Sequence, residues 1–398
     1  MNLTNEEKAM LLGEKGPALR RAMEIIFALG SIYGAGETVP IKSAQISGVS
    51  YKNLGEAGLD FLKKWASEGA RVLVPAMMNP AGMDLRRWKE MGIPEEFALK
   101  QLEVVETLIS MGVEPTLTCA PYLGRYRPGF GEHLAWSESS AVIFANSVIG
   151  ARTNREGGPS ALAAAIAGRT ACYGFHSDSG REPAYLVEVL CHLKSEADFG
   201  ALGYLIGRKL VDKTPYLRFC EEHLSGELYL RAMGASMAAS GSISLFHAEG
   251  LTPEAEVFRS AEFKEPPLTI TSLEEAFQAL SKPLDRVDLI WIGCPHASLE
   301  EIELIASMVK GRRLSTRLWV TSSREIIGKA EEAVEAIEEA GGFVLADTCV
   351  VVAPVEALNI KSVATNSAKA AFYLPSWAKV KVVFASLEEC IFRYGGLQ

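Results

Sequence analysis

Seven cysteines carry the most reactive side chains in the sequence, and their spacing limits the chemistry they could perform. They stand at positions 119, 172, 191, 220, 294, 349 and 390, and no two form a Cys-x-x-Cys pair. Zinc ribbons, thioredoxin-type redox sites and ferredoxin-type cluster motifs depend on such pairs, so the sequence excludes these classes. A metal site built from cysteines must therefore be assembled from distant parts of the chain.

Three of these cysteines come at the ends of segments that we interpret as buried strands. Cys119 follows residues 113–118, Cys294 follows residues 287–293, and Cys349 follows residues 343–347. Open α/β sheets bind their ligands at the carboxyl ends of parallel strands. Three thiolates meeting there would suit an iron–sulfur cluster with one iron free of protein ligands, which can act as a Lewis acid. Zinc held by three thiolates is the chemical alternative, and burial as small hydrophobic side chains is the structural one.

The other four cysteines are predicted to be core residues. Cys191, Cys220 and Cys390 fall in predicted helices among apolar neighbours, and Cys172 lies in a packed region. Small buried thiols of this kind pack like other hydrophobic side chains.

Polar side chains near the predicted strand ends could bind an anion. Ser322, Ser323 and Arg324 follow a strand at residues 317–321 and begin a helix, where free N–H groups attract carboxylates or phosphates. Asn79 and Asp84 follow another strand, and a simple turn is the alternative there. A third set is Ser137, Ser139, Ser140, Asn146, Arg152, Thr153, Asn154 and Arg155, for which a structural loop network is the alternative. His296 stands two residues after Cys294 and is the histidine we place near the site, a solvent-facing loop position being the alternative.

The elements that must position these residues alternate between strand and helix. Residues 287–293, 317–321 and 343–347 read as strands, with helices beginning at residue 299 and spanning 324–340, which predicts a parallel sheet covered by helices. Towards the N-terminus we expect helices at 5–29, 54–68 and 94–111 and strands at 70–74 and 113–118. Alanines 161–167 predict a tightly packed helix. The expected division is an α/β region at 1–135, a substrate-binding region at 136–262 and an α/β region at 263–398.

Charge and hydropathy narrow the class of protein further. The 398 residues include 40 Lys and Arg against 49 Asp and Glu, a formal net charge of −9, which argues against nucleic-acid binding. We expect no membrane association, because no apolar run reaches the length of a membrane span, and the first residues do not resemble a signal peptide. A cytoplasmic enzyme is expected.

Six motifs in order resemble the large subunit of the aconitase X family over nearly the whole chain. They are residues 47–51 (SGVSY), 79–84 (NPAGMD), 135–140 (AWSESS), 146–154 (NSVIGARTN), 293–296 (GCPH) and 347–349 (DTC). The resemblance implies an α/β, aconitase-like multi-domain body with its active site in a crevice between domains. It also implies a hydro-lyase whose iron–sulfur cluster, expected to be [4Fe-4S], is held by Cys119, Cys294 and Cys349.

The resemblance further implies a partner and a substrate. The family's swivelling domain is expected on a separate small subunit, which would carry the catalytic base, leaving Ser47 and His296 as this chain's candidate catalytic residues. Some members dehydrate cis-3-hydroxy-L-proline. Archaeal two-subunit members convert (R)-mevalonate 5-phosphate to trans-anhydromevalonate 5-phosphate, and residues 152–158 favour this type. Gln45 departs from the histidine expected in many relatives. A non-catalytic scaffold subunit is the remaining alternative.

Overall fold

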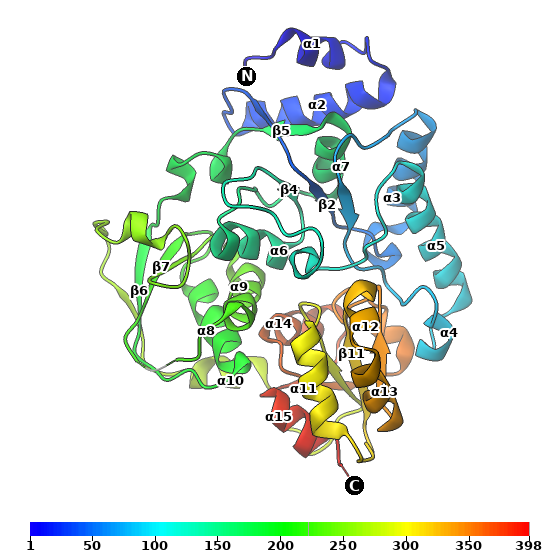
Figure 1. Cartoon of the computed structure of the whole chain (residues 1–398), viewed down its shortest axis with the longest axis vertical. Helices are drawn as coiled ribbons and strands as arrows, with labels where there is room; N and C mark the ends of the chain where they lie inside the picture. Colours follow the sequence, from blue (N-terminus) through cyan, green and yellow to red (C-terminus); the bar gives the residue numbers. More distant parts are fainter. Residues whose placement is uncertain (222, 398) are drawn as a thin grey trace.

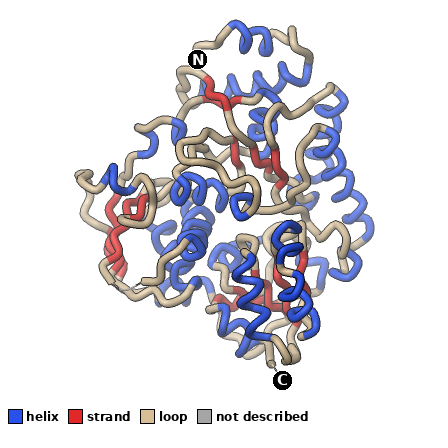
Figure 2. The backbone as a smooth tube through the Cα atoms, in the orientation of Figure 1, coloured by secondary structure: helices blue, strands red, loops and turns tan. Residues whose placement is uncertain are grey.

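The computed structural model describes residues 1–221 and 223–397, which form three lobes, each containing a parallel sheet (Figure 1). The first lobe carries the N-terminus at the top of the view, the second lies at the left, and the third ends at the C-terminus at the bottom. Helices flank the sheets throughout (Figure 2), which confirms the predicted α/β class. Among the described helices, none has the length and hydrophobicity needed to cross a bilayer.

The first lobe contains a parallel sheet in the order β3-β2-β4 and an antiparallel pair, β1 with β5. Its strands are β1 (Thr38–Pro40), β2 (Ala44–Ile46), β3 (Ala76–Met78), β4 (Ala135–Trp136) and β5 (Arg169–Ala171). Its helices are α1 (Asn5–Leu11), α2 (Pro17–Ile32), α3 (Tyr51–Ser67), α4 (Trp88–Met91), α5 (Glu95–Ser110), α6 (Ser139–Phe144) and α7 (Gly158–Ala167). The predicted small-residue helix is confirmed as α7, which packs on β2 with its alanines fully buried.

Three predicted elements of this lobe are wrong in detail. The helix expected at 5–29 is broken before Pro17, where Gly16 has φ +99°. Residues 70–74 form a loop rather than a strand, and β3 follows them. Residues 113–118 also form a loop, but the Glu114 and Thr118 amides donate to carbonyls on β3 at 2.8 and 3.1 Å. Cys119 therefore still reaches the carboxyl edge of the sheet.

The second lobe has four parallel strands in the order β8-β7-β6-β9. They are β6 (Tyr185–Val189), β7 (Pro215–Phe219), β8 (His247–Ala248) and β9 (Leu268–Ile270), with helices α8 (Glu196–Lys209), α9 (Glu227–Gly241) and α10 (Glu274–Leu280). Cys191 and Cys220 follow β6 and β7 in loops, so their predicted helical placement is wrong. Cys220 is exposed and Cys172 only partly buried, so the core prediction also fails for these two, whereas the partly buried Cys191 packs against the core.

The third lobe is a five-stranded parallel sheet in the order β12-β11-β10-β13-β14. Its strands are β10 (Leu289–Ile292), β11 (Arg317–Thr321), β12 (Phe343–Leu345), β13 (Ser362–Thr365) and β14 (Lys381–Phe384). Its helices are α11 (Leu299–Val309), α12 (Arg324–Lys329), α13 (Glu331–Glu339), α14 (Ala368–Trp377) and α15 (Leu387–Glu389). The predicted β-α-β-α-β unit is confirmed, with the helix expected at 324–340 divided into α12 and α13. Cys390 is fully buried after α15, as predicted.

The strand order of the third lobe reverses between β10 and β13, which creates a topological switch point. The chain runs from β10 outward to β12 and then returns to the other side of β10. Ligands of open α/β sheets bind at such points, beyond the carboxyl ends of the strands. The loop after β10 carries Cys294, and the helix after β13 carries Lys369. The predicted three-part division stays a prediction, and the sheets would place its borders between β5 and β6 and between α10 and β10.

Candidate active site

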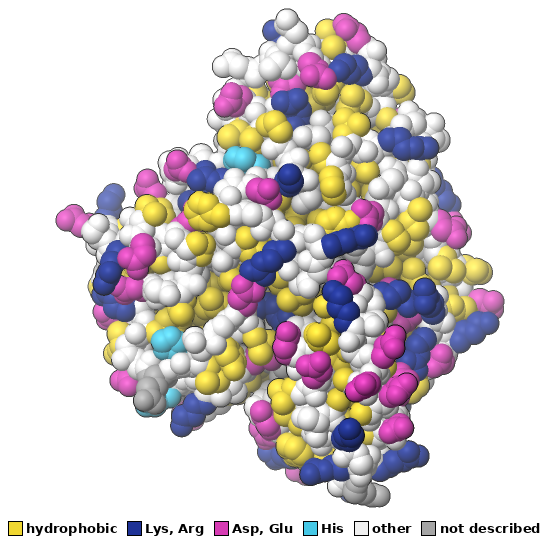
Figure 3. Space-filling view, in the orientation of Figure 1, with side chains coloured by type: hydrophobic (Ala, Val, Ile, Leu, Met, Phe, Trp, Pro, Cys, Tyr) yellow, Lys and Arg dark blue, Asp and Glu magenta, His cyan; other side chains and the backbone are white. Residues whose placement is uncertain are grey.

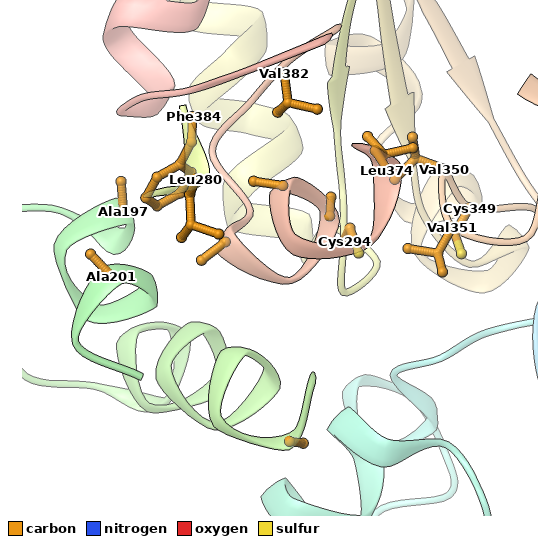
Figure 4. Packing of buried hydrophobic residues seen from close by; sticks show 14 of the residues in the cluster. Ala197, Ala201, Leu280, Cys294, Cys349, Val350, Val351, Leu374, Val382 and Phe384 are labelled. Atoms are coloured by element: carbon orange, nitrogen blue, oxygen red, sulfur yellow. The ribbon is translucent and has the colours of Figure 1, made fainter. Parts of the chain in front are cut away.

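The three cysteines at the predicted strand ends are all buried free thiols. Cys119 is 3%, Cys294 8% and Cys349 6% exposed. Figure 4 shows Cys294 and Cys349 on separate loops at the same edge of the third-lobe sheet. Cys119 approaches from the first lobe, and its sulfur accepts a hydrogen bond from the His296 backbone amide at 3.2 Å. Loops from two lobes thus meet at one site.

The loop that carries Cys294 has a conformation fixed by its neighbours. Gly293 adopts φ +100°, and a Cβ atom there would lie 2.1 Å from the Thr321 carbonyl oxygen, so only glycine fits. At the other end of the loop, the Ser322 hydroxyl donates to the Ala297 carbonyl at 2.5 Å. Ser322, predicted to bind an anion, is fully buried and occupied in holding this loop.

The thiols are close enough to influence one another electrostatically. Burial raises the pKa of all three, that of Cys349 to about 12. The negative charge of a Cys294 thiolate adds to the rise for Cys349, and thiolates at Cys349 and Cys294 add to it for Cys119. Bound metal cations would reverse this penalty, and thiolates are the ligands that iron–sulfur clusters use. In the described part of the chain, no group of three or more His, Cys, Asp or Glu side chains is arranged to hold a single metal ion.

A polar pocket of about 170 Å³ lies beside the loop that follows Cys349. The predicted site residues that line it are Ser47, Asn79, Ser137, Ser139 and Arg155, and they are joined by Glu138, Lys369, Tyr373 and Trp377. The Oδ1 atom of Asn79 is buried and has no hydrogen-bond partner among the described residues. The same is true of Thr348 Oγ1. Such atoms are what a polar ligand would satisfy.

Glu138 and Lys369 form a buried ion pair in this pocket. The Lys369 ammonium donates to Glu138 Oε1 and, at 3.2 Å, to Ser140 Oγ, while Glu138 Oε2 accepts from Asn79 Nδ2 at 2.8 Å. Burial opposes ionisation of Glu138, but the charge and hydrogen bond of Lys369 lower its pKa to about 2. The positive charge of Lys369 also opposes part of the rise that burial causes in the pKa of each of the three thiols. One cation therefore serves both the pocket and the cysteine cluster.

Sequence reasoning missed these two residues for different reasons. Glu138 lies in the motif at residues 135–140, but only the serines on either side of it were predicted to bind an anion, because a carboxylate does not attract one. Lys369 follows β13, a strand of small residues that was not predicted from the sequence. Ser367 caps α14 by accepting from the Ala370 amide at 3.0 Å, and this serine is the sequence signal that could have located the start of the helix. Gln45 links the two halves of the site, because its side chain donates to the Thr118 carbonyl at 3.2 Å and accepts from the Glu138 amide at 3.4 Å.

The Glu138–Lys369 pair should make the stability of the protein depend on pH in the acidic range. A carboxyl whose pKa is lowered by folding stabilises the protein above its unfolded pKa, near 4.5, and this contribution is lost as the pH falls towards 2. Urea unfolding between pH 7 and pH 3 should therefore show a steeper loss of stability for the wild type than for a Glu138→Gln/Lys369→Met double variant. Parallel pH profiles of the two proteins would contradict this expectation.

Arg324 and Asp84, whose role in substrate binding stays a prediction, form an internal ion-pair network. Arg324 pairs with both Asp84 and Asp347, and Asp84 Oδ2 also accepts from the Ala346 amide at 2.9 Å. Ser323 caps α12 by accepting from the Ile326 amide at 3.2 Å. Ser323 and Arg324 face a different groove from the one that contains Lys369.

Replacing Arg324 with glutamine is expected to destabilise the protein by about 3 kcal/mol, because it leaves two buried carboxylates without their cation. Chemical denaturation measures this loss, and Arg317→Gln, at an exposed arginine on β11, is the matched control. The substrate KM should change little. A tenfold rise in KM with unchanged stability would instead support the substrate-binding role predicted from sequence.

Residues 146–154 hold local structure and do not line the polar pocket, whereas the next residue, Arg155, does. Asn146 bonds the backbone of Thr153 in both directions, at 2.8 and 3.0 Å, and Thr153 Oγ1 accepts from the Trp136 amide at 3.0 Å. Asn154 donates to the Tyr173 carbonyl at 3.0 Å, and Arg152 pairs with Asp178. These contacts favour the structural alternative for Asn146, Arg152, Thr153 and Asn154, whose substrate-binding role stays a prediction.

His296 is buried beside the thiols rather than exposed on a loop. It is 1% accessible, and burial lowers its pKa to about 4. Its ring contacts Thr118 Oγ1 at 3.0 Å through Nδ1 and the Thr348 carbonyl at 2.8 Å through Nε2. Both ring nitrogens are thus occupied by neighbours of the cysteines.

Comparison with known proteins places this arrangement in a family. Models of the first, second and third domains of aconitase X match residues 1–179, 183–279 and 287–394. The chain belongs to the aconitase X family. The crystal structure of Thermococcus kodakaraensis aconitase X (holo-form) superimposes with a TM-score of 0.90 and 44% identity, covering 98% of this chain and 99% of that one.

Curated aconitase X relatives share most of the sequence. The phosphomevalonate dehydratase large subunit of Methanocaldococcus jannaschii is 48% identical over 98% of this chain and 99% of its own length. That of Methanosarcina mazei is 46% identical over 98% and 96%. Cis-3-hydroxy-L-proline dehydratase of Pseudomonas aeruginosa is more distant, at 34% identity over 97% of this chain and 68% of that protein.

Proposed function

We propose that this chain is the large, catalytic subunit of a phosphomevalonate dehydratase acting in the archaeal mevalonate pathway, in the cytoplasm. It would remove water from (R)-mevalonate 5-phosphate to give trans-anhydromevalonate 5-phosphate. The observation that carries the proposal is the meeting of three buried cysteine loops beside a pocket that holds Lys369 and Glu138. The end-to-end similarity to phosphomevalonate dehydratase large subunits supports the choice of substrate.

Cys119, Cys294 and Cys349 are the residues that would hold a [4Fe-4S] cluster. The site fits this group, because all three thiols are free and buried, and Cys119 already accepts an amide hydrogen bond. Three protein ligands leave one iron open, and such an iron supplies a Lewis acid for the substrate hydroxyl and carboxylate.

The pocket residues would bind and orient the anionic substrate. Lys369 and Arg155 supply positive charge, Ser47 and Ser139 supply hydroxyl donors, and the free Oδ1 of Asn79 can accept from a substrate hydroxyl. Ser47 thereby remains a candidate catalytic residue. The net charge of −9 opposes anion binding, so attraction must come from local cations. On the face seen in Figure 3, Lys and Arg side chains along the boundary between the third lobe and the rest are interspersed with Asp and Glu, so a positive field must arise within the pocket.

A small subunit carrying the swivelling domain would complete the active site. This chain covers 99% of the Methanocaldococcus jannaschii large subunit but only 68% of the longer Pseudomonas aeruginosa protein. Because the relatives matched over their whole length are named large subunits, we infer a separate small partner, giving a heterodimer. That partner would carry the base that abstracts the substrate proton.

Product analysis tests the proposal directly. The chain is purified anaerobically with its small subunit, reconstituted with iron and sulfide, and incubated with (R)-mevalonate 5-phosphate or cis-3-hydroxy-L-proline. Nuclear magnetic resonance should show an alkene product from (R)-mevalonate 5-phosphate and no product from cis-3-hydroxy-L-proline. Turnover of the amino acid alone would identify the alternative dehydratase, and turnover of neither by cluster-loaded enzyme would favour a scaffold.

A further inference from the structure

One side chain contacts all three cysteine loops at once. His296 follows Cys294 by two residues, and its ring reaches Thr118, the residue before Cys119, on one side. On the other side the ring reaches Thr348, the residue before Cys349. The His296 backbone amide also donates to the sulfur of Cys119. A contact set of this kind fixes the three loops relative to one another.

The direction of each hydrogen bond follows from the acceptors. A carbonyl oxygen only accepts, so His296 Nε2 must donate to Thr348, and the neutral ring then has a lone pair on Nδ1. Thr118 Oγ1 donates to that lone pair while accepting from the Ala120 amide at 3.1 Å. These hydrogen bonds therefore hold the residues on both sides of Cys119, and they leave neither ring nitrogen of His296 available to a substrate.

The backbone of His296 is fixed as well. Its carbonyl accepts from the Arg231 guanidinium at 3.4 Å, and Arg231 is itself buried and paired with Glu301. Glu301 accepts from the Ser298 amide at 2.8 Å in the capping box of α11. The backbone of His296 is thus anchored to the second and third lobes, while its ring contacts the first lobe through Thr118.

We propose that His296 is a positioning residue that sets the relative placement of Cys119, Cys294 and Cys349 before the cofactor is assembled. This inference rests on the proposed function in that it assumes the three thiols bind one cofactor. It replaces the catalytic role that was the sequence-based expectation for His296. The ring orders the ligands and does not touch the substrate.

The first test uses the full-length chain without cofactor, so that it does not depend on dehydratase activity. Alkylation of each cysteine by iodoacetamide is followed by mass spectrometry in the wild type and in His296→Ala. Cys119 and Cys349 should react at least about tenfold faster in the variant, because two hydrogen bonds that hold their loops are lost. Cys390, buried elsewhere, is the internal control and should be unchanged.

Milder variants keep the test decisive if His296→Ala unfolds. Thr118→Val removes one contact without touching the histidine, and His296→Asn and His296→Gln each retain a group able to replace one ring nitrogen. All three should show intermediate alkylation rates. Unchanged rates at Cys119 and Cys349 in folded variants would overturn the inference, whatever the substrate proves to be.

The second test separates positioning from proton transfer. After reconstitution, His296 variants should contain less iron and sulfide per chain, while turnover per assembled cluster stays within about twofold of the wild type. His192→Ala, at an exposed histidine, should match the wild type in both measurements. Full cluster content with lost turnover would overturn the inference and support a catalytic role for His296, such as proton transfer. Failure of wild-type turnover with unchanged cluster content would instead count against the proposed substrate.

Discussion

Replacing Cys349 with serine is expected to lower dehydratase turnover by at least about a thousandfold, among the largest effects of a single change in the site. A metal Lewis acid supplies several kcal/mol of transition-state stabilisation, and about 4 kcal/mol corresponds to a thousandfold in rate. A hydroxyl is a poor substitute for a thiolate as an iron ligand. Turnover and iron content of the reconstituted enzyme are measured together, because both should fall.

The other cysteines provide the controls for this result. Cys294→Ser and Cys119→Ser should behave like Cys349→Ser, since all three loops meet at the same site. Cys220→Ser should retain full turnover and iron, because Cys220 is an exposed residue of the second lobe. A Cys349→Ser enzyme with normal iron and rate would show that the cluster is held elsewhere.

Replacing Lys369 with methionine is expected to reduce kcat/KM by about a hundredfold and to destabilise the protein by about 3 kcal/mol. The rate effect follows from loss of a charged hydrogen-bond donor in the pocket. The stability effect follows because Glu138 would remain buried without its cation. Steady-state kinetics and urea unfolding measure the two effects separately, with Lys381→Met, an exposed lysine on β14, as control.

A double variant separates the two roles of Lys369. Adding Glu138→Gln removes the buried carboxylate, so much of the lost stability should return while kcat/KM remains low. Recovery of both quantities together would contradict a direct role for the ammonium group and leave Lys369 a purely structural partner of Glu138.

The third lobe was predictable because its central strands are strongly apolar. β10 and β11 are buried and bounded by glycine or by capping serines, so strand ends and the cysteines after them could be placed from sequence. Position at a strand end selected Cys119 as well, although residues 113–118 are not a regular strand. Leu117 has φ +47° there, and only the amide contacts with β3 keep the segment aligned.

The pocket was less predictable because its main charges gain meaning only through long-range contacts. Glu138 and Lys369 are separated by 231 positions and meet through an ion pair that no local pattern records. Arg324 and Asp84 seemed free to bind a substrate for the same reason, since their partners lie up to 262 positions away. Local periodicity specifies elements, whereas the pairing of buried charges depends on how three lobes pack.

The division of the cysteines between lobes has a thermodynamic consequence. Cys119 belongs to the first lobe, whereas Cys294 and Cys349 belong to the third, so a cofactor bound by all three is a chelate that spans a lobe boundary. The Ser50 hydroxyl donates to the Val352 carbonyl at 2.8 Å, and the Ala81 amide donates to the Asp347 carbonyl at 2.7 Å, already joining the two lobes. These contacts raise the effective concentration of the third thiolate at the other two. By linkage, cofactor binding then tightens the lobe boundary as much as the boundary tightens the cofactor.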